Sequence, residues 1–417
     1  MDIRLFLKNE IRGSWKSLIA IATVLALSLA LSISAMSLDR LIRKSSAQAA
    51  DAFDLLVGAK GSSSALLLGS VFLRDEMLSP IPATVLKDTT ARGGVSWMAP
   101  LAFGDRIGNS PLVGTTEEMV TLGGKRHLAS GRSFRAANEA VVGVAAGFQV
   151  GQKLHADHGR VHGVGDKHDE LAFTVVGVLP KTGTPWDRAV LVPVESVWRM
   201  HDHDKKHTHG NFDLTFGVSA GAMTQVSDKT LQALPGFSAL VIKPADFSSA
   251  YRLRSRLSKT TLEMGNGQAV ALSAVFSGEV LVDLFGSLDT AGHALYAVTY
   301  ASLAIALIAV VLFGWMLVHL RSPGLLTLRV MGAPSRYIVS VIWALVMTVV
   351  CWGAVGGLVV GESFAHLAAY WISQQIGIAM TVALSAKEWI VFLIVIVAGA
   401  FAALVPAIGV WRKTSLN

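Results

Sequence analysis

The sequence is poor in charged residues and almost free of cysteine. Only 16% of its 417 residues are Asp, Glu, Lys or Arg, whereas soluble domains contain about 25%. The hydrophobic fraction is 52% and the mean hydropathy is +0.52. These values exclude an intrinsically disordered chain and argue against a wholly soluble one. The single cysteine, Cys351, lies in an apolar run, so no intrachain disulfide can form.

The phosphate-binding loop of nucleotide-binding proteins and the zinc-protease motif are missing as well. A phosphate-binding loop needs Gly-x-x-x-x-Gly-Lys-Ser/Thr, because backbone amides and one lysine surround the phosphates. Gly123-Gly124-Lys125 comes nearest, but Arg126 follows it and Met119 stands where the first glycine belongs. There is also no His-Glu-x-x-His pair. We therefore expect no catalytic residues in this chain, and no ATP bound to it.

Four apolar segments are long enough to cross a bilayer, which takes about 20 residues. They are residues 17–38, 294–320, 337–360 and 389–410. The first exceeds the apolar core of about 7–15 residues found in signal peptides, which favours a retained span. The preceding residues, 1–16, have the spacing of an amphipathic helix that lies on the membrane.

Basic residues are concentrated in three short flanks. Residues 1–16 hold four basic and two acidic residues, the 321–336 loop holds three basic residues and no acidic one, and the 411–417 tail holds two basic residues. Together these flanks account for the net charge of the whole protein, +7. Flanks rich in Lys and Arg stay in the cytoplasm. We therefore predict that both termini and the 321–336 loop are cytoplasmic. The sequence pI of 9.5 then reflects topology and not nucleic-acid binding.

The large segment 39–293 would lie outside the cell membrane, together with a shorter loop, 361–388. Short strand-like runs punctuated by Gly and Pro occur in it, for example at 54–62, 139–144 and 171–179. Helical patterns cover 248–262 and 280–296. The predicted fold is therefore a four-span α-helical membrane protein with a large α+β extracytoplasmic domain between spans one and two.

Histidines are unevenly distributed, since eight of the twelve fall between positions 155 and 209. Imidazole and carboxylate groups close in sequence can bind zinc or copper. The candidate ligands are His201, His203, His207 and His209. The alternative is a pair of solvated loops of biased composition, because Lys205 and Lys206 would repel a cation.

Several short motifs, taken in order, resemble those of one family. Leu328-Arg329-Val330-Met331-Gly332-Ala333-Pro334 resembles its cytoplasmic loop, and Pro406-Ala407 followed by Arg412 resembles the end of its last span. Gly131-Arg132-Ser133-Phe134 followed by Glu139-Ala140-Val141-Val142-Gly143 resembles a turn and strand of its outer domain. With the order of one span, a large domain and three spans, the chain resembles the MacB and LolC/LolE permeases of the ABC superfamily, the FtsX-like group. It departs at Ser322-Pro323-Gly324-Leu325, where many members have a glutamate.

This resemblance implies a mechanotransmission permease of the bacterial inner membrane, with its large domain in the periplasm. It implies a permease dimer, of identical or related chains, that works on partner ATPase subunits carrying the ATP and Mg²⁺. The implied activity is export, or extraction of a substrate from the periplasm or outer leaflet. The alternatives are a lipoprotein-release permease and a regulator of cell-envelope enzymes that transports nothing.

The resemblance also places the contact with the ATPase in the cytoplasmic loop. Leu325, Leu328 and Met331 are spaced i, i+3 and i+6 and form a short apolar stripe. With Arg329 and Gly332 of the family motif, they are the predicted coupling residues. The alternative is a helix whose stripe lies on the membrane lipid.

Overall fold

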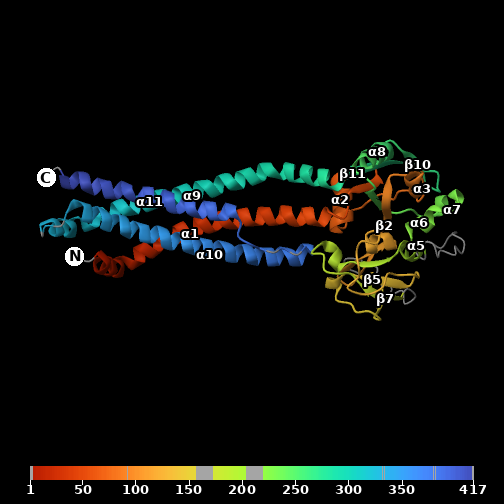
Figure 1. The fold of residues 1–417 in the computed structure, drawn as a ribbon, viewed down its shortest axis with the longest axis horizontal. Helices are drawn as coiled ribbons and strands as arrows, with labels where there is room; N and C mark the ends of the chain where they lie inside the picture. The colour runs from red at the N-terminus through yellow and green to blue at the C-terminus, as the bar shows by residue number, and fades with distance from the viewer. Residues whose placement is uncertain are drawn as a thin grey trace. The chain divides into compact units, whose positions relative to one another are not determined.

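The computed structural model describes residues 3–91, 93–155, 172–202, 219–330, 332, 334–378, 380 and 382–415. The chain divides into two compact units (Figure 1). The helical unit comprises Met1–Arg43, Leu288–Ile372 and Met380–Asn417. The sheet unit comprises Lys44–Ser287 and Ser373–Ala379.

Four helices build the helical unit: α1 (Ile3–Ala50), α9 (Ser277–Val330), α10 (Ser335–Ile376) and α11 (Ala386–Ser415). Each contains a stretch long and apolar enough to cross a membrane: Trp15–Ala50, Gly292–His319, Arg336–Gln374 and Ala386–Ile408. Large apolar side chains such as Leu27, Ile305 and Leu393 are exposed on their surfaces, as expected where helices face lipid. The predicted fold class, four spans with a large mixed domain after the first, is confirmed.

Three of these helices are at least twice as long as a bilayer requires. α1, α9 and α10 have 48, 54 and 42 residues. At 1.5 Å per residue they are about 72, 81 and 63 Å long, against a hydrocarbon core of about 30 Å. α1 and α9 continue without a break from residues of the helical unit into residues of the sheet unit.

α9 also continues beyond its apolar stretch at the other end. The predicted span ends at residue 320, but α9 remains helical through Pro323 and Gly324 as far as Val330. Gly332 then has a φ of +90°, which glycine adopts without strain, and α10 begins at Ser335. The turn at Gly332 therefore separates α9 from α10.

Small residues bring α1 and α10 into backbone contact. Three glycines of α10 repeat every four residues on one helix face: Gly353, Gly357 and Gly361. A Cβ atom at Gly357 would lie only 2.8 Å from the carbonyl oxygen of Ala26. The Ser34 hydroxyl donates a hydrogen bond to the carbonyl oxygen of Gly361 at 2.9 Å. We call this contact the glycine seam. Close packing and interhelical hydrogen bonds of this kind hold spans together where apolar lipid removes the hydrophobic driving force.

The described residues of the sheet unit form an 11-stranded sheet. Its strands are β1 (Leu55–Ala59), β2 (Val95–Ile107), β3 (Ser110–Thr115), β4 (Ser130–Gly131), β5 (Glu139–Val142), β6 (Lys153–His155), β7 (Ala172–Val178), β8 (Val190–Pro193), β9 (Ala239–Pro244), β10 (Thr261–Glu263) and β11 (Ala269–Phe276). Their order is β10-β11-β1-β9-β2-β3-β8-β5-β7-β4, and β6 pairs with β7. β3 with β8 and β5 with β7 are parallel pairs, and the other pairs are antiparallel.

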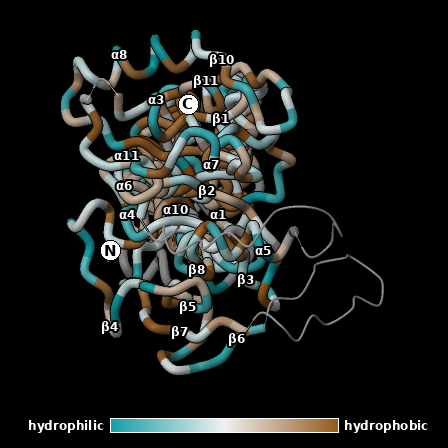
Figure 2. The backbone as a smooth tube through the Cα atoms, turned by 90° about the vertical axis from the view of Figure 1, so that its right-hand side faces the viewer, coloured by the Kyte–Doolittle hydropathy of each residue, from teal (hydrophilic) through white to brown (hydrophobic). Residues whose placement is uncertain are grey.

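Short helices accompany the sheet: α2 (Ser63–Phe72), α3 (Val85–Thr90), α4 (Glu117–Thr121), α5 (Val194–Asp202), α6 (Ala220–Thr224), α7 (Asp228–Ala233) and α8 (Phe247–Leu257), with 3₁₀ turns η1 (Val144–Ala146) and η2 (Pro185–Arg188). Hydrophilic and hydrophobic residues are interspersed along α8 (Figure 2). Its buried residues include Leu253 and Leu257, which are four residues apart and share one helix face.

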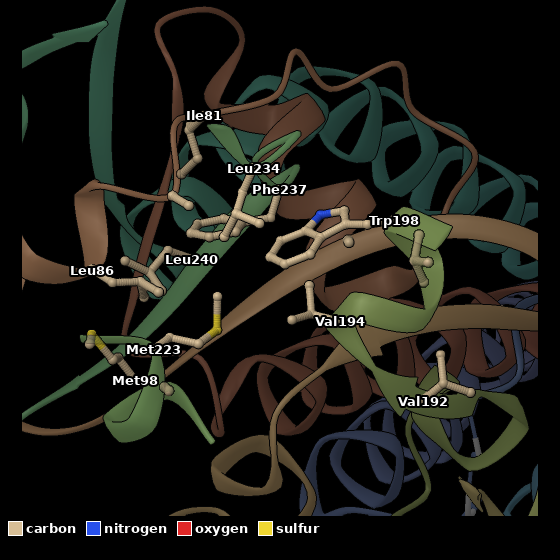
Figure 3. Packing of buried hydrophobic residues seen from close by; sticks show 14 of the residues in the cluster. Ile81, Leu86, Met98, Val192, Val194, Trp198, Met223, Leu234, Phe237 and Leu240 are labelled. Carbon is tan, nitrogen blue, oxygen red and sulfur yellow. The ribbon is translucent and has the colours of Figure 1, made fainter. Parts of the chain in front are cut away.

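Both faces of the sheet are buried, because successive side chains of a strand point to opposite faces. In β1, Leu55 and Val57 belong to one apolar cluster and Leu56 to the other. The first cluster also contains Trp198, which packs near Phe237 and Leu234 (Figure 3). The indole Nε1 of Trp198 donates to the carbonyl oxygen of Gly236 at 2.6 Å, so its one polar group is satisfied.

One predicted helix is shorter than expected. The sequence favours a helix over 248–262, but α8 ends at Leu257, and Thr261–Glu263 form β10. Leu262 pairs with Val270 of β11. Pairing with a strand distant in sequence outweighs local helix propensity here, and β-branched Thr260 and Thr261 favour the extended backbone.

Candidate transmission site

The predicted coupling residues lie at one end of α9. Leu325, Leu328 and Arg329 fall in its last two turns, and exposed Gly332 forms the turn that follows. The helical backbone there places positions 325 and 328 on one face, as the stripe requires. Met331 lies outside the described residues, and the coupling role of this segment stays a prediction.

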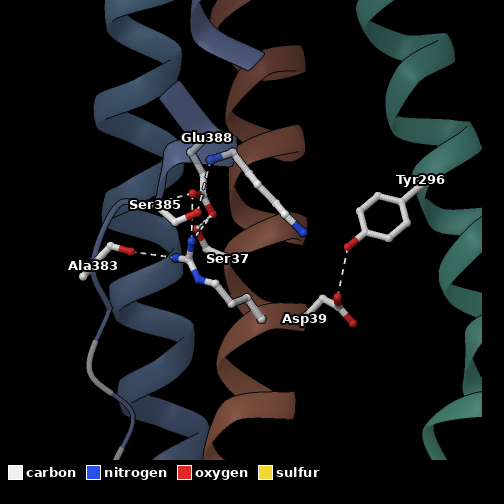
Figure 4. Close-up of polar contacts among 8 residues, drawn as sticks. Ser37, Asp39, Tyr296, Ala383, Ser385 and Glu388 are labelled. Atoms are coloured by element: carbon white, nitrogen blue, oxygen red, sulfur yellow. Dashed lines mark hydrogen bonds and ion pairs between the residues drawn. The ribbon is translucent and has the colours of Figure 1, made fainter. Parts of the chain in front are cut away.

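A buried glutamate joins α1 to the start of α11. Glu388 is 1% exposed, and its carboxylate lies 2.8 Å from the guanidinium of Arg40 on α1. The Ser37 hydroxyl and the Ser385 amide also donate to it, at 3.2 and 2.8 Å (Figure 4). Arg40 donates further to the carbonyl oxygen of Ala383 at 2.6 Å. We call these residues the Glu388 cluster. The hydrogen bonds and the ion pair offset the free-energy cost of removing these polar groups from water. The cluster therefore holds α1 and α11 together.

A second set of polar contacts joins α1 to α9. Arg43 pairs with Asp39 one turn before it on α1, at 2.9 Å, and with Asp289 on α9. The Tyr296 hydroxyl of α9 donates to Asp39 at 3.1 Å (Figure 4). α1 therefore carries polar contacts to both α9 and α11 within about two turns of helix.

Within the sheet unit, α1 and α9 are anchored in the apolar core. Residues 49–50 of α1 and 280–281 of α9 belong to the same buried cluster. The ring of Phe53, which follows α1, lies 5.5 Å from the ring of Trp186. These residues pack on the sheet. If either helix end is displaced, the sheet must therefore move with it, or this packing must break.

The last turn of α10, from Ser373, belongs to the sheet unit. Arg188, at the end of η2, donates to the carbonyl oxygen of Gln374 at 2.8 Å. Gly377, just beyond the helix, has a φ of +76° and comes close to the same arginine. α10 is therefore the third long helix, after α1 and α9, whose end lies within the sheet unit.

The glycine-arginine motif of the outer domain has a clear structural role. A Cβ at Gly131 would lie 2.1 Å from the carbonyl oxygen of Val176, so only glycine fits beside β7. Arg132 donates two hydrogen bonds to the carboxylate of Glu139, at 2.8 and 2.5 Å. This pairing lowers the pKa of Glu139. The motif therefore fixes the entry of the chain into β5.

The segment nearest to a phosphate-binding loop ends a helix instead. Gly123 follows α4 with a φ of +65°, and a Cβ there would lie 2.3 Å from the Trp97 ring. Arg126 donates to the carbonyl oxygens of Met119 and Val120, at 2.6 and 2.7 Å. Burial lowers the pKa of Arg126 to about 10, so it remains cationic at neutral pH. These residues close the end of α4.

Most of the histidine-rich sequence lies outside the described residues. His201 falls in the last turn of α5, whereas His203, His207 and His209 are not described. Among the residues that the structure does describe, no group of three or more His, Cys, Asp or Glu side chains is arranged to hold a metal. The zinc hypothesis stays a prediction.

Two features of the helical unit were not predicted, although the sequence carries a signal for each. Ser385-Ala386-Lys387-Glu388 before an apolar run is a capping box, and here the Ser385 amide does donate to Glu388. The repeat of glycine at every fourth position from 353 to 361 is typical of close helix packing in membranes. The residues that each feature contacts, Arg40 for Glu388 and Ala26 for Gly357, lie on α1, far away in the sequence.

Taken together, the four apolar helices and the mixed sheet inserted after the first define a multi-pass membrane protein with a large domain outside the bilayer. The family model of the MacB-like periplasmic core domain matches residues 17–233, which is more than half of the chain. The chain therefore belongs to the MacB/FtsX-like family of ABC transporter permeases. Membership implies an ATPase partner in general. A comparison with curated proteins found no match.

Proposed function

We propose that this chain is the permease subunit of an ABC transporter that transmits ATP-driven motion from a separate ATPase to its own outer domain. The carrying observation is the continuity of α9, whose 54 residues run from the core of the sheet unit to the predicted coupling segment. Helices without a break transmit displacement along their axis. The substrate would be exported, or extracted from the periplasm or outer leaflet.

The contacts of α1 support this proposal. The Glu388 cluster and the Arg43 contacts hold α1 against α11 and α9, and the far end of α1 packs in the same core as α9. A shift of α9 would therefore be shared with α1. The described apolar stretches carry few ionisable residues, and ion or proton pathways need such residues. This favours transmission of motion over conduction through the spans.

The proposal includes an orientation in the inner membrane. The basic flanks favour a cytoplasmic location for residues 1–16, 321–336 and 411–417, and hence a periplasmic sheet unit. The coupling segment then faces the ATPase. The function requires that the chain purify with an ATPase subunit, as a dimer on an ATPase dimer, and stimulate its hydrolysis of ATP.

Cysteine labelling tests this orientation. Lys229 is exposed in α7 of the sheet unit, and Ser335 begins α10. In a Cys351→Ala background, Lys229→Cys should react with a membrane-impermeant thiol reagent in intact spheroplasts. Ser335→Cys should react only after lysis. The reverse pattern would overturn the orientation, and with it the route from the ATPase to the outer domain.

A further inference from the structure

An apolar groove runs along the helical unit between α1 and α10. Its volume is about 560 Å³. Trp15 and Ile19 of α1 and Trp352 of α10 are among its lining residues and are each more than half exposed. Three other lining residues are half-buried and small: Ala22, Ala26 and Gly356. They lie beside the glycine seam, where the two helices pack closely.

The groove is open at Gly356. A Cβ added there would meet only the Cβ of Ala26, at 3.5 Å, which is ordinary contact. At neighbouring Gly357 the same atom would lie 2.8 Å from a backbone oxygen. One glycine therefore packs against α1, whereas the other leaves space that an apolar group can fill.

The length of the groove matches one leaflet of a membrane. Its lining residues on α1 run from Trp15 to Ala26. Eleven residues of helix rise about 17 Å, and half of the hydrocarbon core is about 15 Å thick. An extended acyl chain of a phospholipid therefore has the length of the groove.

Two cations stand at one end of it. Arg12 and Lys16 are exposed; Arg12 is three residues before Trp15 and Lys16 is three residues before Ile19, so each cation shares a helix face with a groove residue. The Lys16 ammonium lies 5.9 Å from the centroid of the Trp15 ring. Long basic side chains and tryptophan are the residues that meet lipid headgroups at a membrane interface.

We propose that this groove binds one anionic phospholipid, with an acyl chain along Ala22, Ala26 and Gly356 and its phosphate at Arg12 and Lys16. A second copy of the chain fits less well. A symmetric contact centred on this face would bring the same two cations of both copies together, at a cost in repulsion. The lipid would come from the cytoplasmic leaflet in the orientation proposed above, but its binding does not depend on that orientation.

Native mass spectrometry of the full chain in mild detergent tests the proposal, with phosphatidylglycerol as the anionic probe and phosphatidylcholine as the zwitterionic one. The wild type should retain one phosphatidylglycerol in preference to phosphatidylcholine. Each basic residue near a charged lipid surface contributes about 1 kcal/mol. Removing two, in Arg12→Gln/Lys16→Gln, should weaken phosphatidylglycerol retention about tenfold or more. Phosphatidylcholine should lose much less, because its choline group cancels the charge of its phosphate.

Filling the groove should displace the acyl chain itself. Gly356→Phe should lower retention of both lipids. Val355→Phe is the matched control, because Val355 is exposed on α10 and does not line the groove. Equal retention by the wild type and Gly356→Phe would overturn the proposal, as would equal loss in Val355→Phe. A dimer that dissociates in Gly356→Phe with no change in lipid retention would assign the groove to a second copy instead.

Discussion

Glu388→Ala is expected to lower the free energy of unfolding by about 3 kcal/mol, the low end of the range for breaking a buried ion pair. The substitution leaves the Arg40 guanidinium without its carboxylate, and the low end applies because Arg40 is 29% exposed. It also removes the acceptor for the Ser385 amide at the start of α11. Denaturant unfolding of the full chain in detergent, followed by tryptophan fluorescence, measures the loss.

A double-mutant cycle separates the ion pair from general damage to the fold. Arg40→Ala/Glu388→Ala removes both charges, so it should lose less stability than the sum of the two single substitutions. Glu388→Gln keeps the shape of the side chain and should fall between the wild type and Glu388→Ala. Strict additivity of the two single effects would show that Arg40 and Glu388 do not stabilise one another.

Gly357→Leu is expected to disrupt the contact between α1 and α10. Its Cβ would lie 2.8 Å from both the Ala26 carbonyl oxygen and the Leu29 Cβ, so the two backbones must separate. Overpacking costs about 1–3 kcal/mol, and the upper value is expected here because the clash includes backbone. The better helix propensity of leucine, about 1 kcal/mol, offsets only part of this. Thermal unfolding in detergent should show a clearly lower midpoint.

Gly356→Leu is the matched control for this effect. It is the adjacent residue of the same helix and receives the same side chain, but an added Cβ there meets only Ala26, at 3.5 Å. Its thermal midpoint should stay near that of the wild type. If both variants lower the thermal midpoint equally, the loss comes from placing leucine anywhere in this part of α10 and not from the contact at the glycine seam.

The spans and several strands could be predicted because their signals are local. Apolar runs of bilayer length predict helices, and glycine or proline punctuation predicts strand ends, as at β1, β5 and β7. The long strand β2 was missed. Pro100 and Gly104 interrupt its alternation, and its register with β3 shifts between Phe103 and Arg106.

The contacts of the candidate site depend on distant partners, which local patterns do not reveal. Glu388 lies 348 residues from Arg40, and no spacing rule connects them. The glycine repeat of α10 indicates that a close helix contact exists, but not that α1 provides it. The sheet order likewise places β9 between β1 and β2, far from its neighbours in sequence. The positions of helices and strands along the chain were therefore easier to predict than the contacts between them.

The most direct test of the central claim is whether the segment after α9 connects this permease to an ATPase. The wild type and Met331→Leu, which keeps an apolar side chain, should purify with the ATPase subunit and stimulate its ATP hydrolysis in lipid nanodiscs. Met331→Glu places a charge in the predicted apolar contact and should abolish both, while membrane insertion and elution stay normal. Association and stimulated hydrolysis at wild-type levels in Met331→Glu would contradict the account.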